Sequence, residues 1–583
     1  MRKFLSVLLT LCMVLPLIAV TAPKASAATL TDSGSQIPII RIAGDGEPIC
    51  DADGKEVLKF KDIIKAFSSD GGSDADIGGS AKTIIEALVN GYKKNDYSEY
   101  YEVVYKEMSE LFSEIQLDKN GEVTNGTDIS KNVRRWMANL STTDRKNENG
   151  KGYYALADYP FWYDWRLDPL KIADELHNYI TKIKQTTGAV KVSLATRCLG
   201  TQVALAYVAK YGTDDIHGLS FDGGTVYGSE PLSEMICGKF EINDGKAALR
   251  FIEDLEYYGM FKGFDEFTEA TIDMLVKTGA VGTVTDVVRE TIYKKIAQGA
   301  TSAIARSTFF CCPSYWGSVT AEDYQDALNY IFGEEGSDMR KEYAGLIEKL
   351  DNYDEKVRQR IPELLQKIKD DGVKVCVIGK YGTQMVPTCE SMDLVGDQIA
   401  SLYRSTFGAT TSKVLTTLSD EYIEKQTKAG LGKYISPDKQ VDASTCFWPD
   451  STWFIKGVTH SDWTSFENHI AYTVITADRQ LTVDDFTDCS QYMVAIPQRD
   501  ENGNIKYGRN DYLMYADYVK MTEDNCHVEA WADDVEAEKN ALTRFVSGFK
   551  SWATWLPMFM AKFAEFFDKV MKMISDAVTK IVS

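Results

Sequence analysis

Short apolar segments alternate with amphipathic segments in the first half of the chain, and this alternation constrains the fold more than any other feature. The runs that have strand character are residues 37–43, 154–163, 190–195 and 216–221. Helical periodicity occupies residues 168–183 and 199–211 between them, and Gly188 is expected to end the first of these helices. Because strands joined by crossover helices run parallel, the pattern predicts an α/β fold in which a mostly parallel sheet has helices on both faces.

A long helical stretch interrupts this alternation after residue 228. Strand character returns at residues 373–378 and again at 452–459, so we expect one sheet that is split by a large insertion. A helical segment at 82–116 and a hairpin turn at 500–503 complete the outline. The expected organisation is a signal peptide (1–27), a first core part (28–228), a helical cap (229–370), a second core part (371–470), a mixed extension (471–532) and an amphipathic helical tail (533–583).

The N-terminus has the features of a secretory signal peptide. Arg2 and Lys3 precede an apolar run over residues 4–20, and Ala25-Ser26-Ala27 forms a small-residue cleavage site. The alternative is a retained membrane anchor, which the cleavage signal disfavours. No later apolar run reaches the ~18 residues that a spanning helix needs. We therefore expect a secreted, extracellular protein.

The charge balance argues against two kinds of partner. The chain carries 64 basic and 86 acidic side chains, a net charge of −22, and its isoelectric point is about 4.8. A polyanion does not neutralise phosphates, so we expect no nucleic-acid partner. General attraction to an anionic membrane surface is disfavoured for the same reason.

Ten cysteines follow the cleavage site, and their spacing contains no CxxC pair and no zinc-binding pattern. Ten in so long a chain do not make a disulfide scaffold. We expect mostly buried thiols, although a bridge between Cys389 and Cys446 is an alternative that the sequence leaves open.

One strand leads directly into a helix through a tight turn, with a nucleophilic side chain at its apex. The segment is Lys191-Val-Ser-Leu-Ala-Thr196-Arg197-Cys198-Leu199-Gly200-Thr201. This is the arrangement of a nucleophile elbow, with Cys198 in place of the usual serine. The helix N-terminus and a nearby histidine would favour a thiolate there, and the amide of Leu199 would face a developing oxyanion.

A second segment gives the pattern a family resemblance. Phe161-Trp162-Tyr163-Asp164-Trp165-Arg166-Leu167-Asp168-Pro169 resembles the Tyr-Asp-Trp-Arg segment of the lecithin:cholesterol acyltransferase and phospholipid:diacylglycerol acyltransferase-like group, which includes bacterial lipase-like members. The resemblance covers roughly residues 37–230 and 371–465 and implies an α/β-hydrolase fold. Asp164 and Arg166 are expected to form a structural ion pair rather than a substrate clamp.

The resemblance also implies roles for individual residues. Cys198 takes the place of the nucleophile, Asp397 that of the acid and His460 that of the base, in the order that this fold uses. Asp393 is an alternative acid. The oxyanion hole would combine the amides of Leu199 and Asp45.

Besides Cys198, two further positions differ from the family pattern. Thr196 replaces the first glycine of the elbow, and Gln398 replaces a glycine that often follows the acid. A β-branched residue at Thr196 would crowd the turn.

The expected function is a secreted hydrolase or acyltransferase that acts on carboxylic esters or thioesters, with a lipid ester as the favoured substrate. It would work through an acyl-cysteine intermediate, and no metal or organic cofactor is implied. The alternative is a catalytically inactive binding protein that keeps the fold. Thiol labelling at Cys198 would separate these two possibilities.

The C-terminal segment has a strongly amphipathic pattern. Between residues 551 and 583, apolar side chains recur at steps of three and four, and lysines lie among them. This predicts a helix that contacts a membrane or lipid interface, or alternatively one that docks on the protein itself or on a second copy. The sequence leaves the oligomeric state open.

Overall fold

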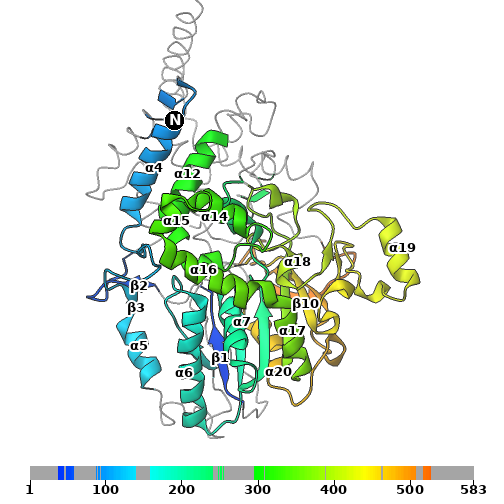
Figure 1. The fold of residues 1–583 in the computed structure, drawn as a ribbon. Helices are drawn as coiled ribbons and strands as arrows, with labels where there is room; N and C mark the ends of the chain where they lie inside the picture. Colours follow the sequence, from blue (N-terminus) through cyan, green and yellow to red (C-terminus); the bar gives the residue numbers. More distant parts are fainter. Residues whose placement is uncertain are drawn as a thin grey trace, which may run out of the picture. The chain divides into compact units, whose positions relative to one another are not determined.

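The computed structural model describes residues 37–44, 48–57, 84–139, 158–239, 247–254, 294–506 and 516–526, with short gaps inside several of these ranges (Figure 1). The chain divides into two units, residues 1–526 and 527–583, and every described residue belongs to the first. The expected signal peptide, Asp45 and the amphipathic tail lie outside the described residues.

An eight-stranded sheet forms the centre of the first unit. Its spatial order is β12-β11-β10-β7-β6-β5-β1-β4, and every neighbouring pair is parallel except β11 with β12. The described strands of this sheet are β1 (Ile39–Ile42), β4 (Asp158–Phe161), β5 (Val192–Arg197), β6 (Ile216–Asp222), β7 (Lys374–Tyr381), β10 (Thr452–Lys456), β11 (Tyr492–Pro497) and β12 (Ala516–Lys520). Short pairs join β2 (Ile49–Cys50) to β3 (Asp128–Ile129) and β8 (Thr410–Thr411) to β9 (Val441–Asp442).

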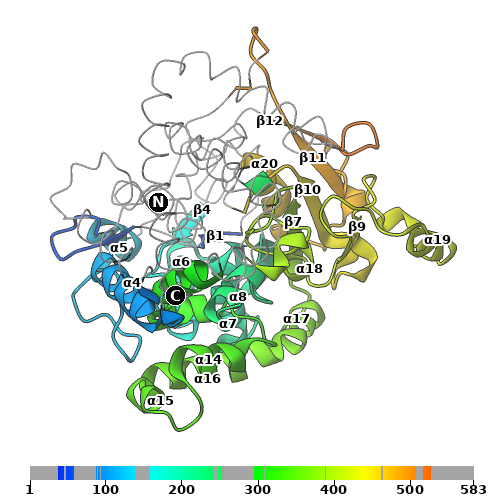
Figure 2. The ribbon, with the colours of Figure 1, turned by 90° about the horizontal axis from the view of Figure 1, so that it is seen from above.

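Helices cover both faces of the sheet, as the alternating pattern predicts. Figure 2 shows α20 on the opposite side of the sheet from α6 and α7. The described helices are α4 (Ser98–Leu111), α5 (Lys131–Ala138), α6 (Pro169–Thr187), α7 (Leu199–Tyr211), α8 (Glu230–Ile236), α12 (Lys294–Ser307), α13 (Pro313–Trp316), α14 (Tyr324–Phe332), α15 (Asp338–Glu342), α16 (Ala344–Lys356), α17 (Ile361–Asp370), α18 (Leu402–Ser405), α19 (Asp420–Lys428) and α20 (Ser465–Ile475).

The alternation of side chains along each strand divides the core into two clusters. On β5, Leu194 packs with the large cluster beneath α6 and α7, whereas Ala195 packs with the smaller cluster beneath α20. The central strands are buried on both faces, which explains why apolar residues occur at adjacent positions along them. Gly218 on β6 allows α20 to approach closely, because an added Cβ there would lie 2.6 Å from Cα of Ile475.

Local sequence signals account for the ends of the elements. Asp168 caps α6 by accepting a hydrogen bond from the amide of Leu170, and Pro169 occupies the first turn. The predicted stop at Gly188 is confirmed, since this residue is the C-cap with φ of 74°. The helix expected at 82–116 is interrupted at residues 95–97, where Asn95 has a φ of 50°, and it ends at Leu111; the strand expected at 452–459 ends at Lys456. A turn closes at residues 500–503, where the amide of Gly503 donates to the carbonyl of Asp500.

Within residues 229–370, every described element is helical. The last two α-helices of this stretch, α16 and α17, contact α7, and α17 leads directly into β7. Leu346, Leu350 and Leu365 therefore belong to the same apolar cluster as the residues beneath α6 and α7. In the part of the chain that the structure describes, no helix is both long and apolar enough to cross a bilayer.

The ten described cysteines are all buried thiols, as the spacing led us to expect. Cys389 and Cys446, the alternative pair, are both in this reduced form. Burial raises the pKa of most of these thiols, for example that of Cys446 to about 12. They behave as small apolar residues, and the sheet, not a set of cross-links, organises this part of the chain.

Candidate active site

Cys198 lies at the turn between β5 and α7 in a backbone conformation that is unusual for a residue with a side chain. Its φ is 49° and its ψ is −129°, and it forms the N-cap of α7. The turn is fixed by two contacts. The amide of Cys198 donates to the carbonyl of Asp222 on β6 at 3.2 Å, and its own carbonyl accepts from the hydroxyl of Thr201 at 2.6 Å. Such strain is common where a nucleophile is presented at a strand-to-helix turn.

Two glycines let the neighbouring chain approach this turn. An added Cβ on Gly44, just after β1, would lie 2.9 Å from the sulphur of Cys198 and 3.3 Å from the amide nitrogen of Leu199. An added Cβ on Gly200 would lie 2.9 Å from the carbonyl oxygen of Ala43. The backbone after β1 therefore runs directly over the nucleophile position, beside the Leu199 amide.

The substitution of Thr196 for the first glycine of the elbow is accommodated within the sheet. Thr196 is buried at the end of β5, and its hydroxyl donates to the carbonyl of Ser220 on the adjacent strand β6. The carbonyl on β6 thus provides a hydrogen-bond partner for the Thr196 hydroxyl, a polar group that a glycine at this position would not have. The position at which the neighbouring backbone comes too close for a side chain is Gly200 instead.

Asp397 and His460 form a buried hydrogen-bonded pair. Nδ1 of His460 lies 2.8 Å from Oδ2 of Asp397, and the amide of His460 donates to the carbonyl of Asp397 at 2.9 Å. Because an ionised carboxylate can only accept, Nδ1 carries the proton. The alternative acid, Asp393, instead pairs with Lys413 at 3.3 Å. The geometry therefore brings Asp397, and not Asp393, to the histidine.

The electrostatics of this pair favour a charged imidazole beside Cys198. Burial lowers the pKa of His460, but the charges of Asp397 and Cys198 outweigh burial and raise it to about 10. Burial also opposes ionisation of Asp397, yet His460, the amide of Ala400 and Lys380 lower its pKa. Nε2 of His460 is buried, and Nδ1 is already engaged with Asp397. Nε2 is the ring atom left to exchange a proton.

The loop that carries Asp397 is tightly closed and strained at one residue. Oδ1 of Asp397 accepts the amides of Ile399 and Ala400 at 3.2 and 2.8 Å, which fixes the carboxylate toward His460. Gln398 has a φ of 87° and is fully buried. Neither its side-chain oxygen nor its nitrogen has a hydrogen-bond partner in the described structure. The position at which the family pattern often has glycine thus retains a backbone that suits glycine.

A buried cluster of four charged residues lies at the ends of the strands that hold the site. Lys380 on β7 pairs with Asp222 on β6 at 2.9 Å and with Glu467 on α20 at 3.2 Å, and all three side chains are almost fully buried. Burial opposes the charge on Lys380, but the two carboxylates outweigh it and raise the pKa of this lysine. Burial raises the pKa of Glu467, whereas Lys380 opposes that shift.

The same cluster holds the loop that carries His460. Arg197, the fourth member and the residue before Cys198, donates to the main-chain carbonyl of His460. Glu467 accepts from the amide of Thr464, and with Thr464 it forms the capping box of α20. The loop between β10 and α20 is therefore attached at His460 itself and at its far end. Sequence reasoning missed these residues, although a lysine within the apolar strand 373–381 was a usable signal.

The Tyr163–Arg166 segment holds the backbone that lies next to Cys198. The Tyr163 hydroxyl lies 2.6 Å from the carbonyl oxygens of both Ala43 and Gly44 and holds the backbone that passes over Cys198. Arg166 makes two hydrogen bonds to Asp164, at 2.9 and 2.6 Å, and both side chains are buried. This is the structural ion pair that the sequence analysis expected.

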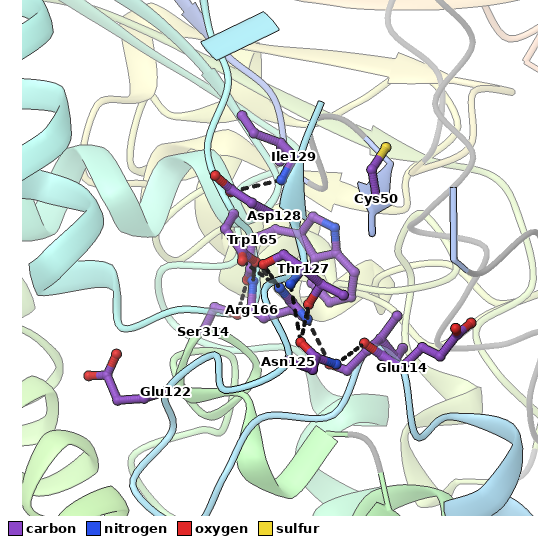
Figure 3. Close-up of polar contacts among 12 residues, drawn as sticks. Cys50, Glu114, Glu122, Asn125, Thr127, Asp128, Ile129, Trp165, Arg166 and Ser314 are labelled. Carbon is purple, nitrogen blue, oxygen red and sulfur yellow. Dashed lines mark hydrogen bonds and ion pairs between the residues drawn. The ribbon is translucent and has the colours of Figure 1, made fainter. Parts of the chain in front are cut away.

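Arg166 also connects distant parts of the chain. It donates to the carbonyl of Ile115 and to the hydroxyl of Thr127, which in turn lies 2.7 Å from the amide oxygen of Asn125 (Figure 3). The carbonyl of the neighbouring Trp165 accepts from Ser314 (Figure 3). These contacts join the loop that follows β4 to residues 114–129 and to α13. The partners all belong to the protein itself, and the side chains of Asp164 and Arg166 are buried.

Of the five residues expected in the site, the structure places four. Cys198, Leu199, Asp397 and His460 lie at the ends of β5, β7 and β10 or in the loops that follow them, while Asp45 lies outside the described residues. Comparison with known proteins adds no family assignment to this geometry. No protein-family model matches the sequence, and no curated protein is significantly similar to it.

Proposed function

We propose that this protein is an ester or thioester hydrolase, or an acyltransferase, of the α/β-hydrolase type, and that it works through an acyl-Cys198 intermediate. The observation that carries the proposal is the combination of a strained cysteine at a strand-to-helix turn with a buried histidine–aspartate pair next to it. The order of the three residues along the chain, Cys198, Asp397 and His460, agrees with the order in that fold. The resemblance to the lecithin:cholesterol acyltransferase-like group supports the same assignment.

The first half-reaction follows from the charges of the site. The His460 imidazole takes the thiol proton of Cys198 on Nε2, and the resulting thiolate attacks the carbonyl carbon of the substrate. The amide of Leu199 donates to the oxyanion, and a second donor would come from the backbone after Gly44. His460 then gives its proton to the departing alkoxide or thiolate, and the acyl group remains on the sulphur as a thioester.

The second half-reaction reverses these roles. Water or an alcohol gives a proton to Nε2 of His460 and attacks the acyl carbon, and the carbon–sulphur bond breaks. The products are a carboxylic acid or a new ester, together with the regenerated Cys198. Throughout, Asp397 holds the Nδ1 proton and stabilises the imidazolium, as the acid of a Ser-His-Asp triad does.

Capture of the intermediate tests the proposal. The full chain is incubated with p-nitrophenyl esters of increasing acyl length, and the acyl adduct is located by mass spectrometry after acid quenching. We expect an adduct on Cys198, and loss of turnover in Cys198→Ala with an unchanged thermal transition. Cys50→Ala is the matched control, because Cys50 is 8 % exposed and Cys198 7 %. Full turnover by Cys198→Ala would remove this residue from the mechanism, whereas a native chain that gives neither turnover nor an adduct would favour the catalytically inactive binding protein.

A lipid ester as substrate, and export from the cell, belong to the same proposal. They derive from the family resemblance, the signal-peptide pattern and the amphipathic pattern of residues 551–583. Removing residues 551–583 tests whether the substrate is a lipid ester. Activity on soluble esters should persist, while liposome binding and activity on emulsified lipid should fall. Aggregation or a lost thermal transition in the truncated chain would instead assign these residues to the protein's own packing.

A further inference from the structure

Three side chains of metal-ligand type meet beside α20. They are His469 on α20 and the adjacent residues Asp488 and Cys489, which precede β11. One donor atom from each lies within 4.8 Å of the others. Nε2 of His469 is 3.1 Å from Oδ2 of Asp488. None of the three takes part in the catalytic geometry described above.

We infer that His469, Asp488 and Cys489 form a binding site for a divalent transition-metal ion, and that zinc is the ion that suits it best. The argument begins with the donor set of one sulphur, one imidazole nitrogen and one carboxylate oxygen. Calcium and magnesium bind almost entirely through oxygen, whereas zinc accepts all three of these donor types. A thiolate together with an imidazole therefore selects zinc over the hard cations.

The spacing fits a tetrahedral ion after small movements. Zinc binds nitrogen and oxygen at about 2.0–2.2 Å and sulphur at about 2.3 Å, so neighbouring ligands in a tetrahedral site lie about 3.3–3.6 Å apart. The 3.1 Å between His469 and Asp488 needs to widen slightly, and the longest separation, up to 4.8 Å, needs to close by about an ångström. Two of the ligands are exposed side chains that can make these adjustments.

The different burial of the three side chains indicates how an ion would reach the site. The side chains of His469 and Asp488 are 43 % and 64 % exposed, whereas Cys489 is fully buried. An ion would enter from solvent between the exposed pair and bind the buried sulphur beneath them. Binding requires the thiol to lose its proton, so the ion replaces a proton and the existing His469–Asp488 contact. The fourth coordination position remains for water.

Occupancy would join α20 to the chain segment before β11. In the described structure this connection includes the His469–Asp488 contact and the packing of Ile470 and Ala471 with Cys489 in one apolar cluster. Helix α20 begins five residues after His460, so the loop that carries His460 leads into this helix. A metal bound here would therefore stabilise the helix that follows the loop. We therefore assign the ion a structural role.

Cobalt titration of the full chain tests this inference, since cobalt reports both geometry and sulphur ligation. After treatment with a chelator, we expect one equivalent of Co²⁺ to give a thiolate charge-transfer band and the visible bands of a tetrahedral ion, and Zn²⁺ to displace it. Cys489→Ser should abolish the charge-transfer band, and His469→Ala and Asp488→Asn should each weaken binding at least tenfold. Zn²⁺ should also raise the Tm of the native chain but not that of Asp488→Asn.

Two control variants and two outcomes make the test decisive. Asp484→Asn removes a nearby exposed carboxylate, and Cys526→Ser removes another buried thiol; both should bind as the native chain does. Asp488 is exposed enough for Asp488→Asn to fold normally, so the test does not depend on the buried cysteine. Cobalt binding without a charge-transfer band, or with an affinity that these three substitutions leave unchanged, would overturn the inference, as would no binding at millimolar metal.

Discussion

A methyl group added to Gly44 would lie 2.6 Å from Cβ of Cys198 and 2.9 Å from its sulphur. Cys198 and the backbone at Gly44 thus touch without any intervening side chain. We predict that Gly44→Ala displaces the sulphur or the Leu199 amide and lowers kcat/KM on a small ester by about 100-fold, the cost of an ångström-scale misplacement. Gly224→Ala is the control, because its added Cβ meets Thr201 at an ordinary 3.5 Å. Equal activity of the two variants would show that Gly44 does not shape the site.

The His460–Asp397 pair predicts a pH dependence of activity. Because the pKa of His460 is raised to about 10, its imidazolium persists through the neutral range, and kcat/KM should stay flat there and fall as the pH passes about 10. Asp397→Asn removes the main charge that raises this pKa, so the alkaline limb should move toward neutral pH. Rate profiles of both proteins on one ester measure this. An alkaline limb that stays in place in Asp397→Asn would contradict the assigned electrostatics.

The same pair predicts how stability depends on pH. The folded pKa of His460 lies above its unfolded value of about 6.5, so its contribution is complete below pH ~6.5, declines above it and is lost beyond about pH 10. Asp397 has a lowered pKa, so its contribution is present above its unfolded value and is lost as the pH falls through its folded value. The Tm difference between the native chain and Asp397→Asn should therefore shrink at both extremes. A difference that is constant from acid to strongly alkaline pH is the contrary result.

Lys380 is expected to be far more important to stability than an exposed lysine. Lys380→Met leaves Asp222 and Glu467 buried without their cation, which costs roughly 3–5 kcal/mol in the free energy of unfolding. Lys413→Met breaks an exposed pair with Asp393 and should cost less than about 1 kcal/mol. Adding Glu467→Gln to Lys380→Met should recover part of the loss. Denaturant titrations measure all three, and similar losses at Lys380 and Lys413 would refute the cluster's role.

Gln398 offers a stabilising substitution. Gln398→Gly removes the strain of a φ of 87° and a buried side-chain amide that lacks partners, which together outweigh the greater chain entropy of glycine. We expect a gain of about 1 kcal/mol in the free energy of unfolding. Ile399→Gly, at the next position and without a positive φ, should be destabilising. Loss of stability in Gln398→Gly would mean that the amide has partners which the described contacts do not include.

The sequence predicted the strands of the sheet from β4 to β10, which are mostly buried, but it placed β11 and β12 in a mixed extension, and β12 is an edge strand that is only partly buried. The boundaries of α7 agree at both ends, since Cys198 and Gly212 are strong local signals. The choice between Asp393 and Asp397 could not be made from sequence, because it depends on how a loop folds around its own carboxylate. The cluster of Arg197, Lys380 and Glu467 was missed for a similar reason. Its members lie far apart in the chain, and all except Lys380, which interrupts an apolar strand, look like ordinary charged residues until burial is known.

The contact between Arg197 and the carbonyl of His460 spans 263 positions in the chain. A ribosome completes β5 and its cysteine long before it reaches the histidine, so a growing chain contains the thiol without its base. Reactivity at Cys198 would therefore arise only at the end of synthesis, when the loop after β10 docks. If residues 1–27 direct export, the polypeptide would cross the membrane unfolded and unreactive. It would become reactive only after it folds at its destination. Under the proposed function, the insertion at 229–370 would separate the synthesis of Cys198 from the formation of the loop that carries His460.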